Sequence, residues 1–204
     1  MSAQRAAMAA CVALCIAACS IGKPTPQTTT YVVDPPPAAA GPAAARRPET
    51  LRMGNVRVAA AYAGNALVYR LDDVQFVSDP YHAFIAEPGA MLGDRMAEWL
   101  DRSGPFGTVA QPGSARPAQY VLEATVVELY GDFRRERPPA AVLTVQFTMI
   151  DQAGARPRLV HQRTIARRVD LPLASPDALV RGYGKAMAQV LSQLISELSA
   201  ENVK

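Results

Sequence analysis

The sequence predicts an α+β fold, a single domain in which two main helices pack on a mostly antiparallel sheet. Two amphipathic patterns with helical spacing are each preceded by segments in which apolar and polar residues alternate. The resulting order is strands, helix, several consecutive strands and helix, which favours helices laid on a sheet. About 150 residues carry these patterns, which is enough for one domain with a substantial core.

The first eighteen residues, 1–18, resemble a secretory signal peptide. Arg5 supplies one positive charge, and the uncharged run that follows is too short to span a bilayer, which takes roughly 20 apolar residues. The run ends Ile16-Ala17-Ala18-Cys19, which resembles the lipobox of bacterial lipoproteins. We therefore expect lipidation at Cys19 as the first residue of the mature chain. The alternative is an ordinary secreted protein in which Cys19 only lies near a cleavage site.

The lipobox resemblance implies that acyl chains, palmitate among them, attach the mature chain to a membrane. One acyl chain gives only reversible binding, so stable anchoring needs two or more. Ser20 follows the cysteine. Because Asp at that position favours retention in the inner membrane in proteobacterial lipoproteins, Ser20 indicates the periplasmic face of the outer membrane.

Charge and cysteine content exclude several classes of function. Removal of residues 1–18 leaves 186 residues with 20 Lys and Arg against 18 acids, a net charge of +2 that is too balanced for a nucleic-acid binder. Only Cys19 remains of the three cysteines, so neither an internal disulfide nor a thiolate metal site can form.

The sequence also lacks the motifs of common enzymes. It contains no Gly-x-Ser-x-Gly, no His-Glu-x-x-His and no Walker A loop. His82 and His161 are the only histidines, and neither has metal-ligating neighbours at a suitable spacing. We therefore expect that the protein is not an enzyme and that it binds no metal and no cofactor.

Composition divides the mature chain into two parts. Residues 19–50 are expected to be the acylated cysteine and a flexible tether rich in Pro, Ala and Thr, and residues 51–204 the α+β domain. The β-prone tetrad Tyr31–Asp34 interrupts the tether. Either this tetrad, residues 31–34, docks on the domain as an edge strand, or all of residues 20–50 is disordered.

The domain should begin with two strands. Leu51–Ala61 has valines at alternate positions, and Ala63-Gly64-Asn65 signals a turn. Leu67–Phe76 is a second β-prone run, which Asp79-Pro80 should end because proline interrupts a strand.

Two helices with apolar stripes are expected. The first opens at Glu87-Pro88, where a proline loses no hydrogen bond, and ends at Ser103-Gly104-Pro105. The second opens at Ser175-Pro176-Asp177, with Ser as the N-cap and Asp at the positive end of the helix dipole. Gly182 and Gly184 within it should permit close packing rather than bind phosphate. The stripes are Leu92, Met96, Trp99 and Leu100, then Val180, Tyr183, Met187, Val190, Leu191, Leu194 and Leu198.

Between the helices lie the strongest strand patterns. Phe106–Ala110 is a short strand, and Tyr120–Tyr130, Ala141–Asp151 and Leu159–Val169 are longer ones. In the expected strand Ala141–Asp151, every second residue should face the core, namely Leu143, Val145, Phe147 and Met149.

One charged cluster is a candidate binding surface. It lies in the expected hairpin loop Gly131–Pro139 and consists of Phe133, Arg134, Arg135 and Arg137. These side chains are candidates for contact with anionic lipid headgroups or with an acidic partner surface. The preferred alternative is a solvated hairpin tip.

With these elements in place, the chain resembles the ABC-type transport auxiliary lipoproteins (PqiC-like), which accompany MCE-type transporters. The resemblance begins with the acylated cysteine, a short tether and Tyr31-Val32-Val33-Asp34, which favours an ordered strand there. Phe84–Pro88 stands where the family typically has Trp-x-x-x-Pro, so that match is partial. Phe106-x-x-Val109 and the helix from Asp177 to Leu198 complete the pattern.

This resemblance implies a non-enzymatic subunit of a system that moves lipids across the cell envelope. Its partners would be an MCE-domain periplasmic protein and an ABC permease and ATPase, and it would dock their conduit at the outer membrane, with homo-oligomerisation as a further implication. The rival is an outer-membrane lipoprotein that assists assembly or gating of another envelope complex. A weaker rival is an enzyme acting on lipids.

Overall fold

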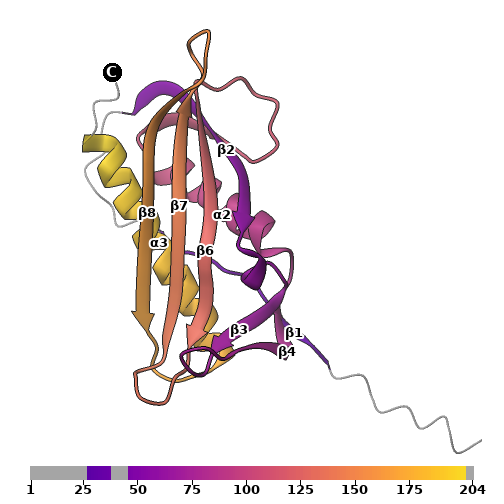
Figure 1. Cartoon of the computed structure of the whole chain (residues 1–204). Coiled ribbons are helices and arrows are strands. Elements are labelled where there is room, and N and C mark those ends of the chain that lie inside the picture. Colours follow the sequence, from indigo (N-terminus) through magenta and orange to yellow (C-terminus); the bar gives the residue numbers. More distant parts are fainter. Residues whose placement is uncertain (1–26, 38–45, 201–204) are drawn as a thin grey trace, which may run out of the picture.

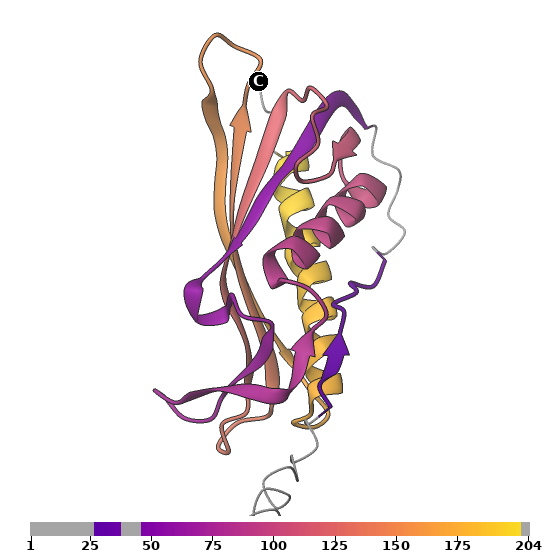
Figure 2. The same cartoon turned by 90° about the vertical axis from the view of Figure 1, so that its right-hand side faces the viewer.

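The computed structural model describes residues 27–37 and 46–200, and these residues form one α+β domain. A long twisted sheet makes one layer and two α-helices cover one of its faces (Figures 1 and 2). The elements are β1 (Thr29–Tyr31), β2 (Arg47–Val58), the short helix η2 (Ala60–Tyr62), β3 (Ala66–Arg70), β4 (Phe76–Phe84), α2 (Pro88–Ser103), β5 (Phe106–Ala110), β6 (Tyr120–Asp132), β7 (Ala140–Asp151), β8 (Arg158–Asp170) and α3 (Pro176–Ala200).

The described strands form a single eight-stranded sheet in which antiparallel pairing predominates. The two longest pairings, β6 with β7 and β7 with β8, are antiparallel, as is β3 with β4. Shorter parallel pairings join β1 to β4, β2 to β5 and β6, and β3 to β6. The predicted α+β class and the mostly antiparallel sheet are therefore confirmed.

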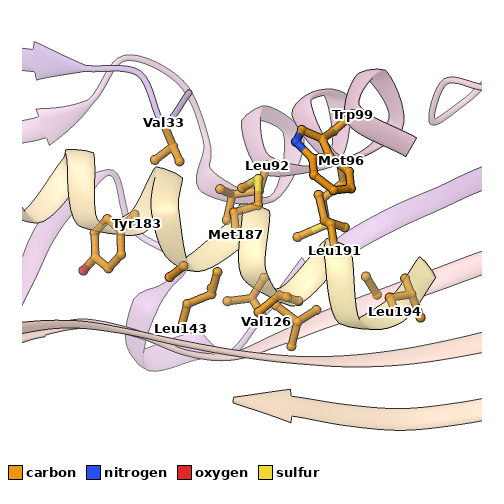
Figure 3. Close-up of a cluster of buried hydrophobic side chains, with 14 of the residues drawn as sticks. Val33, Leu92, Met96, Trp99, Val126, Leu143, Tyr183, Met187, Leu191 and Leu194 are labelled. Atoms are coloured by element: carbon orange, nitrogen blue, oxygen red, sulfur yellow. The ribbon is translucent and has the colours of Figure 1, made fainter. Parts of the chain in front are cut away.

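The core lies between the sheet and the two helices, as Figure 3 shows for side chains of α2, α3 and the sheet. Both predicted helical stripes are buried throughout. The four residues of β7 that were expected to face the core are also buried. Full burial of one such aliphatic side chain contributes roughly 1.5–3 kcal/mol, so these stripes hold the helices on the sheet.

The predicted helix ends are confirmed. Pro88 is the first residue of α2, and the N–H of Gly104 closes the last turn by donating to the Leu100 carbonyl at 2.7 Å. At the start of α3 the Ser175 hydroxyl accepts the N–H of Ala178 at 3.3 Å, as an N-cap does.

The glycines of α3 allow close packing, as expected. A Cβ at Gly182 would come within 2.7 Å of the Cβ of Ala141, and one at Gly184 within 2.5 Å of the Asp34 carbonyl oxygen. No side chain fits at either distance. The main chain near residue 34 therefore lies directly against α3.

The N-terminal strand is offset from the expected tetrad 31–34. β1 comprises Thr29–Tyr31, and Val33, after the strand, is fully buried. The indole N–H of Trp99 donates to the Pro36 carbonyl at 2.9 Å, so this segment is fixed to α2 as well. β2 begins at Arg47, inside the span expected to be tether. Of residues 19–50, only 19–26 and 38–45 lie outside the described residues.

Two predictions about the second β-prone run were wrong. The run is a hairpin, not one strand, because Arg70 closes a turn by donating to the carbonyls of Asp72 and Asp73 at 3.1 and 2.8 Å. Asp79-Pro80 does not end the run but lies within β4. The register of β3 with β4 shifts between Ala66 and Val68, and the resulting bulge accepts a proline that pairs with no strand residue.

Candidate functional site

Two hairpin turns and one loop lie at the same end of the sheet, which we call the hairpin end. They are residues 71–75 between β3 and β4, residues 133–139 between β6 and β7, and residues 171–175 between β8 and α3. Arg70 is in register with Asp132, and Ala140 with Asp170, so the three turns are neighbours. Figure 1 shows them at the lower end of the molecule. The candidate contact residues of the charged cluster belong to this end.

A buried carboxylate organises the hairpin end. Asp132, the last residue of β6, is only 1% exposed. Arg134 donates to it through Nε and Nη2, both at 2.8 Å, and Arg168 of β8 donates to its second oxygen. The hydrogen bonds from Arg134, and then from Arg168, hold the pKa of Asp132 well below its usual value despite its burial. Asp132 is therefore an ion-pair centre that ties β6 to β8.

Arg134 also joins the two hairpin turns. Its Nη1 lies 2.7 Å from Oδ1 of Asp73, at the tip of the β3–β4 hairpin. The same Asp73 lies 3.6 Å from Nη2 of Arg70. The two tips are thus linked by ion pairs.

A second polar cluster supports this end from within the sheet. Phe133 stacks on Tyr69 with ring centroids 4.9 Å apart. The Tyr69 hydroxyl donates to Asp79 at 2.6 Å, and Asp79 also binds the ring of His82 at 2.8 Å. Burial alone would raise the pKa of Asp79, but these hydrogen bonds and that from the Tyr81 N–H lower it overall. Burial and the bond to Asp79 raise the pKa of Tyr69.

The structure separates the four residues of the charged cluster into two pairs. Phe133 and Arg134 are half-buried and serve the structural contacts just described. Arg135 and Arg137 are exposed and make no ion pair among the described residues. Cys19, the expected lipidation site, lies outside the described residues.

Sequence reasoning missed the apolar part of the hairpin end. Val74, at the tip of the β3–β4 hairpin, is 90% exposed, and Leu71 beside it is 41% exposed. Leu173, in the loop before α3, is 56% exposed. The available signal was in the run from Leu67 to Phe76, whose apolar residues were assigned to one strand.

A groove of about 470 Å³ lies on the helical side of the domain. Trp99 of α2, Arg167 of β8 and Gln189, Ser192 and Gln193 of α3 line it. Gln193 accepts a hydrogen bond from Arg167 and donates one to Glu197, so the polar lining is largely internally paired.

The described residues assemble no catalytic constellation that we recognise. They contain no group of three His, Cys, Asp or Glu side chains placed to hold a metal ion. His82 pairs with Asp79 on β4, whereas His161 on β8 lies 3.7 Å from Glu197 of α3, so the two histidines serve separate contacts. Among residues 27–37 and 46–200, no helix is long and apolar enough to cross a membrane.

A family model described as "ABC-type transport auxiliary lipoprotein component" matches residues 31–195. The matched span begins at the end of β1 and ends within α3, so it covers nearly the whole described domain. No curated protein matches the chain.

Solved structures share the fold at low sequence identity. A Xanthomonas campestris protein described by the family model DUF330 superposes with a TM-score of 0.72 at 18% identity, covering 83% of this chain and 94% of that one. The structure of an uncharacterized protein superposes with a TM-score of 0.64 at 19% identity, and the match covers 84% of this chain and 99% of that chain. A PelC dodecamer from Paraburkholderia phytofirmans gives a TM-score of 0.47 at 18% identity, over 80% of this chain and 96% of that chain. This similarity is too low to support an argument about the present chain.

Proposed function

The chain belongs to the family of ABC-type transport auxiliary lipoprotein components, and we propose that it is a non-enzymatic, lipid-anchored subunit of an MCE-type ABC transport system for lipids. It is anchored through Cys19 to the periplasmic face of the outer membrane. There it docks the periplasmic conduit formed by an MCE-domain protein, whose ABC permease and ATPase work at the inner membrane.

The family match is the observation that carries this proposal, because it spans the domain from β1 into α3. The Ile16-Ala17-Ala18-Cys19 run supplies an anchor upstream of that domain.

The distance between anchor and domain limits where the domain works. Cys19 and Thr29, the first residue of β1, are ten residues apart. An extended chain of that length reaches at most about 35 Å, and a flexible one spans about 17 Å on average. The domain therefore stays beside the membrane that holds Cys19, and the partner comes to it.

Mild crosslinking in cells tests the partner directly. The full-length protein with a C-terminal tag is captured after crosslinking, and the captured proteins are identified by mass spectrometry. We expect an MCE-domain protein together with its permease. A Cys19→Ala variant made at the same level is the matched control, and it should capture far less because it is not held at the membrane. Capture of a different envelope complex in place of an MCE protein would favour the rival role in assembly or gating.

A further inference from the structure

We propose that the hairpin end is a membrane-contacting surface. Val74 and Leu71 of the β3–β4 hairpin and Leu173 of the β8–α3 loop enter the acyl region of the leaflet, and Arg135 and Arg137 lie at the level of the headgroup phosphates. The inference rests on the acyl anchor proposed at Cys19. It assigns the orientation in which the anchored domain meets the lipid.

The path of the chain into the domain indicates this orientation. β1 runs parallel to β4, with Thr29 opposite His82 and Tyr31 opposite Phe84, so it runs away from the hairpin end. Tyr31 is close enough to Asp177, in the first turn of α3, for that carboxylate to raise its pKa after the larger effect of burial. Asp34 then lies against Gly184, two turns further along α3.

The chain therefore enters at the hairpin end and continues along α3 toward the opposite end. Figure 2 shows β1 beside the first turns of α3, at the lower end of the molecule. The anchor upstream of Thr29 thus joins the domain on the side where the hairpin turns lie.

Exposed apolar side chains gather on the same side. Val74, Leu71 and Leu173 come from two segments that are far apart in sequence and lie at one end of the sheet. The turns at the opposite end, residues 111–119 and 152–157, contain no large apolar side chain, and the exposed one beside them is Leu159 at the start of β8. Single exposed apolar residues are ordinary, but three of them around the entry of a lipid-anchored chain indicate a lipid surface.

The charges of this end suit an approach to lipid. Asp73 and Asp132 are paired with Arg70, Arg134 and Arg168 in ion pairs. Asp72, in the same turn as Leu71 and Val74, is exposed and accepts the main-chain N–H of Asp73. Pairing lowers the cost of bringing a charged group near hydrocarbon. The exposed arginines flank Glu136, with long stems that allow their guanidinium groups to reach phosphates. Insertion of apolar side chains is therefore the main contact, and it should depend only weakly on salt.

Spin labels at the two ends of the anchored protein test the orientation. Once residues 1–18 are removed and Cys19 is acylated, the mature chain has no free thiol, so Val74→Cys supplies a single labelling site. Ala153→Cys, in the exposed turn between β7 and β8, is the matched control at the opposite end. Both acylated variants are placed in vesicles of phosphatidylethanolamine and phosphatidylglycerol, and label collisions with oxygen and with a water-soluble nickel complex are measured.

We expect the Val74→Cys label to collide with oxygen several-fold more, relative to the nickel complex, than the Ala153→Cys label does. Leu173→Cys should behave like Val74→Cys. If the Val74→Cys label in vesicle-bound protein is as accessible to nickel as the control, the inference is overturned while the anchor stands. Spin–spin broadening at Val74→Cys without oxygen access would also overturn it, because the surface would then join two copies of the chain. If the wild-type mature protein isolated from membranes carries no acyl chain at Cys19 and does not float with the vesicles, the anchor itself is refuted.

Discussion

Replacing Leu191 by alanine should destabilise the domain strongly, because this side chain lies between α3, α2 and the sheet. Leu191 is fully buried, and Figure 3 places it below Met96 and Trp99 of α2. A Leu→Ala change in a core costs about 2–5 kcal/mol, and the cost is highest where the surroundings cannot collapse. Because α2, α3 and the sheet all pack around this side chain, we expect a loss of about 4 kcal/mol. For a domain of this size that corresponds to a fall in Tm of roughly 8–16 °C.

Chemical and thermal denaturation of the full protein in detergent, followed by circular dichroism, measures this loss. Ser192→Ala is the matched control, since Ser192 is the next residue of α3 and is exposed. It should change the free energy of unfolding by less than about 0.5 kcal/mol. A loss below about 1 kcal/mol for Leu191→Ala, or equal losses for both variants, would refute the packing of α3 on the sheet.

Three further predictions concern the hairpin end and the entry of the chain. The pKa of Asp132 is lower in the folded state than its unfolded value of about 4, so its contribution to stability is fully present above that pH and is lost as the pH falls from there through the folded-state pKa. Asp132→Asn should remove this part of the acid sensitivity in urea titrations from neutral pH down to about pH 2. An unchanged pH profile would contradict the ion-pair centre. Gly184→Ala should cost about 1–3 kcal/mol, because the new Cβ would meet the Asp34 carbonyl at 2.5 Å; wild-type stability would show that the segment before Pro36 is not packed there. The double variant Arg135→Glu, Arg137→Glu should change the free energy of unfolding by less than about 0.5 kcal/mol. In vesicles it should also reduce the collision rate of oxygen with a spin label at Val74→Cys. An unchanged collision rate would show that neither arginine contacts headgroups.

The sequence predicted those elements whose residues repeat with a clear period. Leu143, Val145, Phe147 and Met149 alternate along β7, and all four are buried. The helices α2 and α3 begin at prolines that mark a first turn, and Ser175 caps the second. In these elements local propensity and burial agree, so one sequence is sufficient to place them.

Pairing and turn chemistry were harder to predict. The parallel pairing of β2 with β6 joins segments far apart in sequence, and periodicity carries no information about which strands pair. The turn 71–75 has neither glycine nor proline and depends on the Arg70 side chain. β4 tolerates Pro80 because the register shift leaves this residue without a partner in β3. The register shift depends on how the strands pair and could not be predicted from the local sequence.

At the hairpin end, too, some features could be predicted from the sequence and others depend on the fold. The charges of residues 134–137 were visible in the sequence, but the burial of Asp132 between Arg134 and Arg168 arises only when β6 and β8 flank β7. The placement of Val74 and Leu173 at the same end of the sheet likewise follows from the sheet topology. A single sequence gives the residue types of such a surface, and the fold brings them together.

The acyl anchor at Cys19 is the claim on which the reach of the domain, its orientation and its docking role all depend. Mass spectrometry of the N-terminal peptide of protein purified from membranes, combined with separation of inner and outer membranes, tests it most directly. The account predicts a mature chain that begins at a cysteine carrying at least two acyl chains, found in the outer-membrane fraction, and a Cys19→Ala variant that is not processed or not membrane-bound. A mature wild-type chain with an unmodified N-terminus, or a Cys19→Ala variant that still matures and fractionates with the outer membrane, would contradict it.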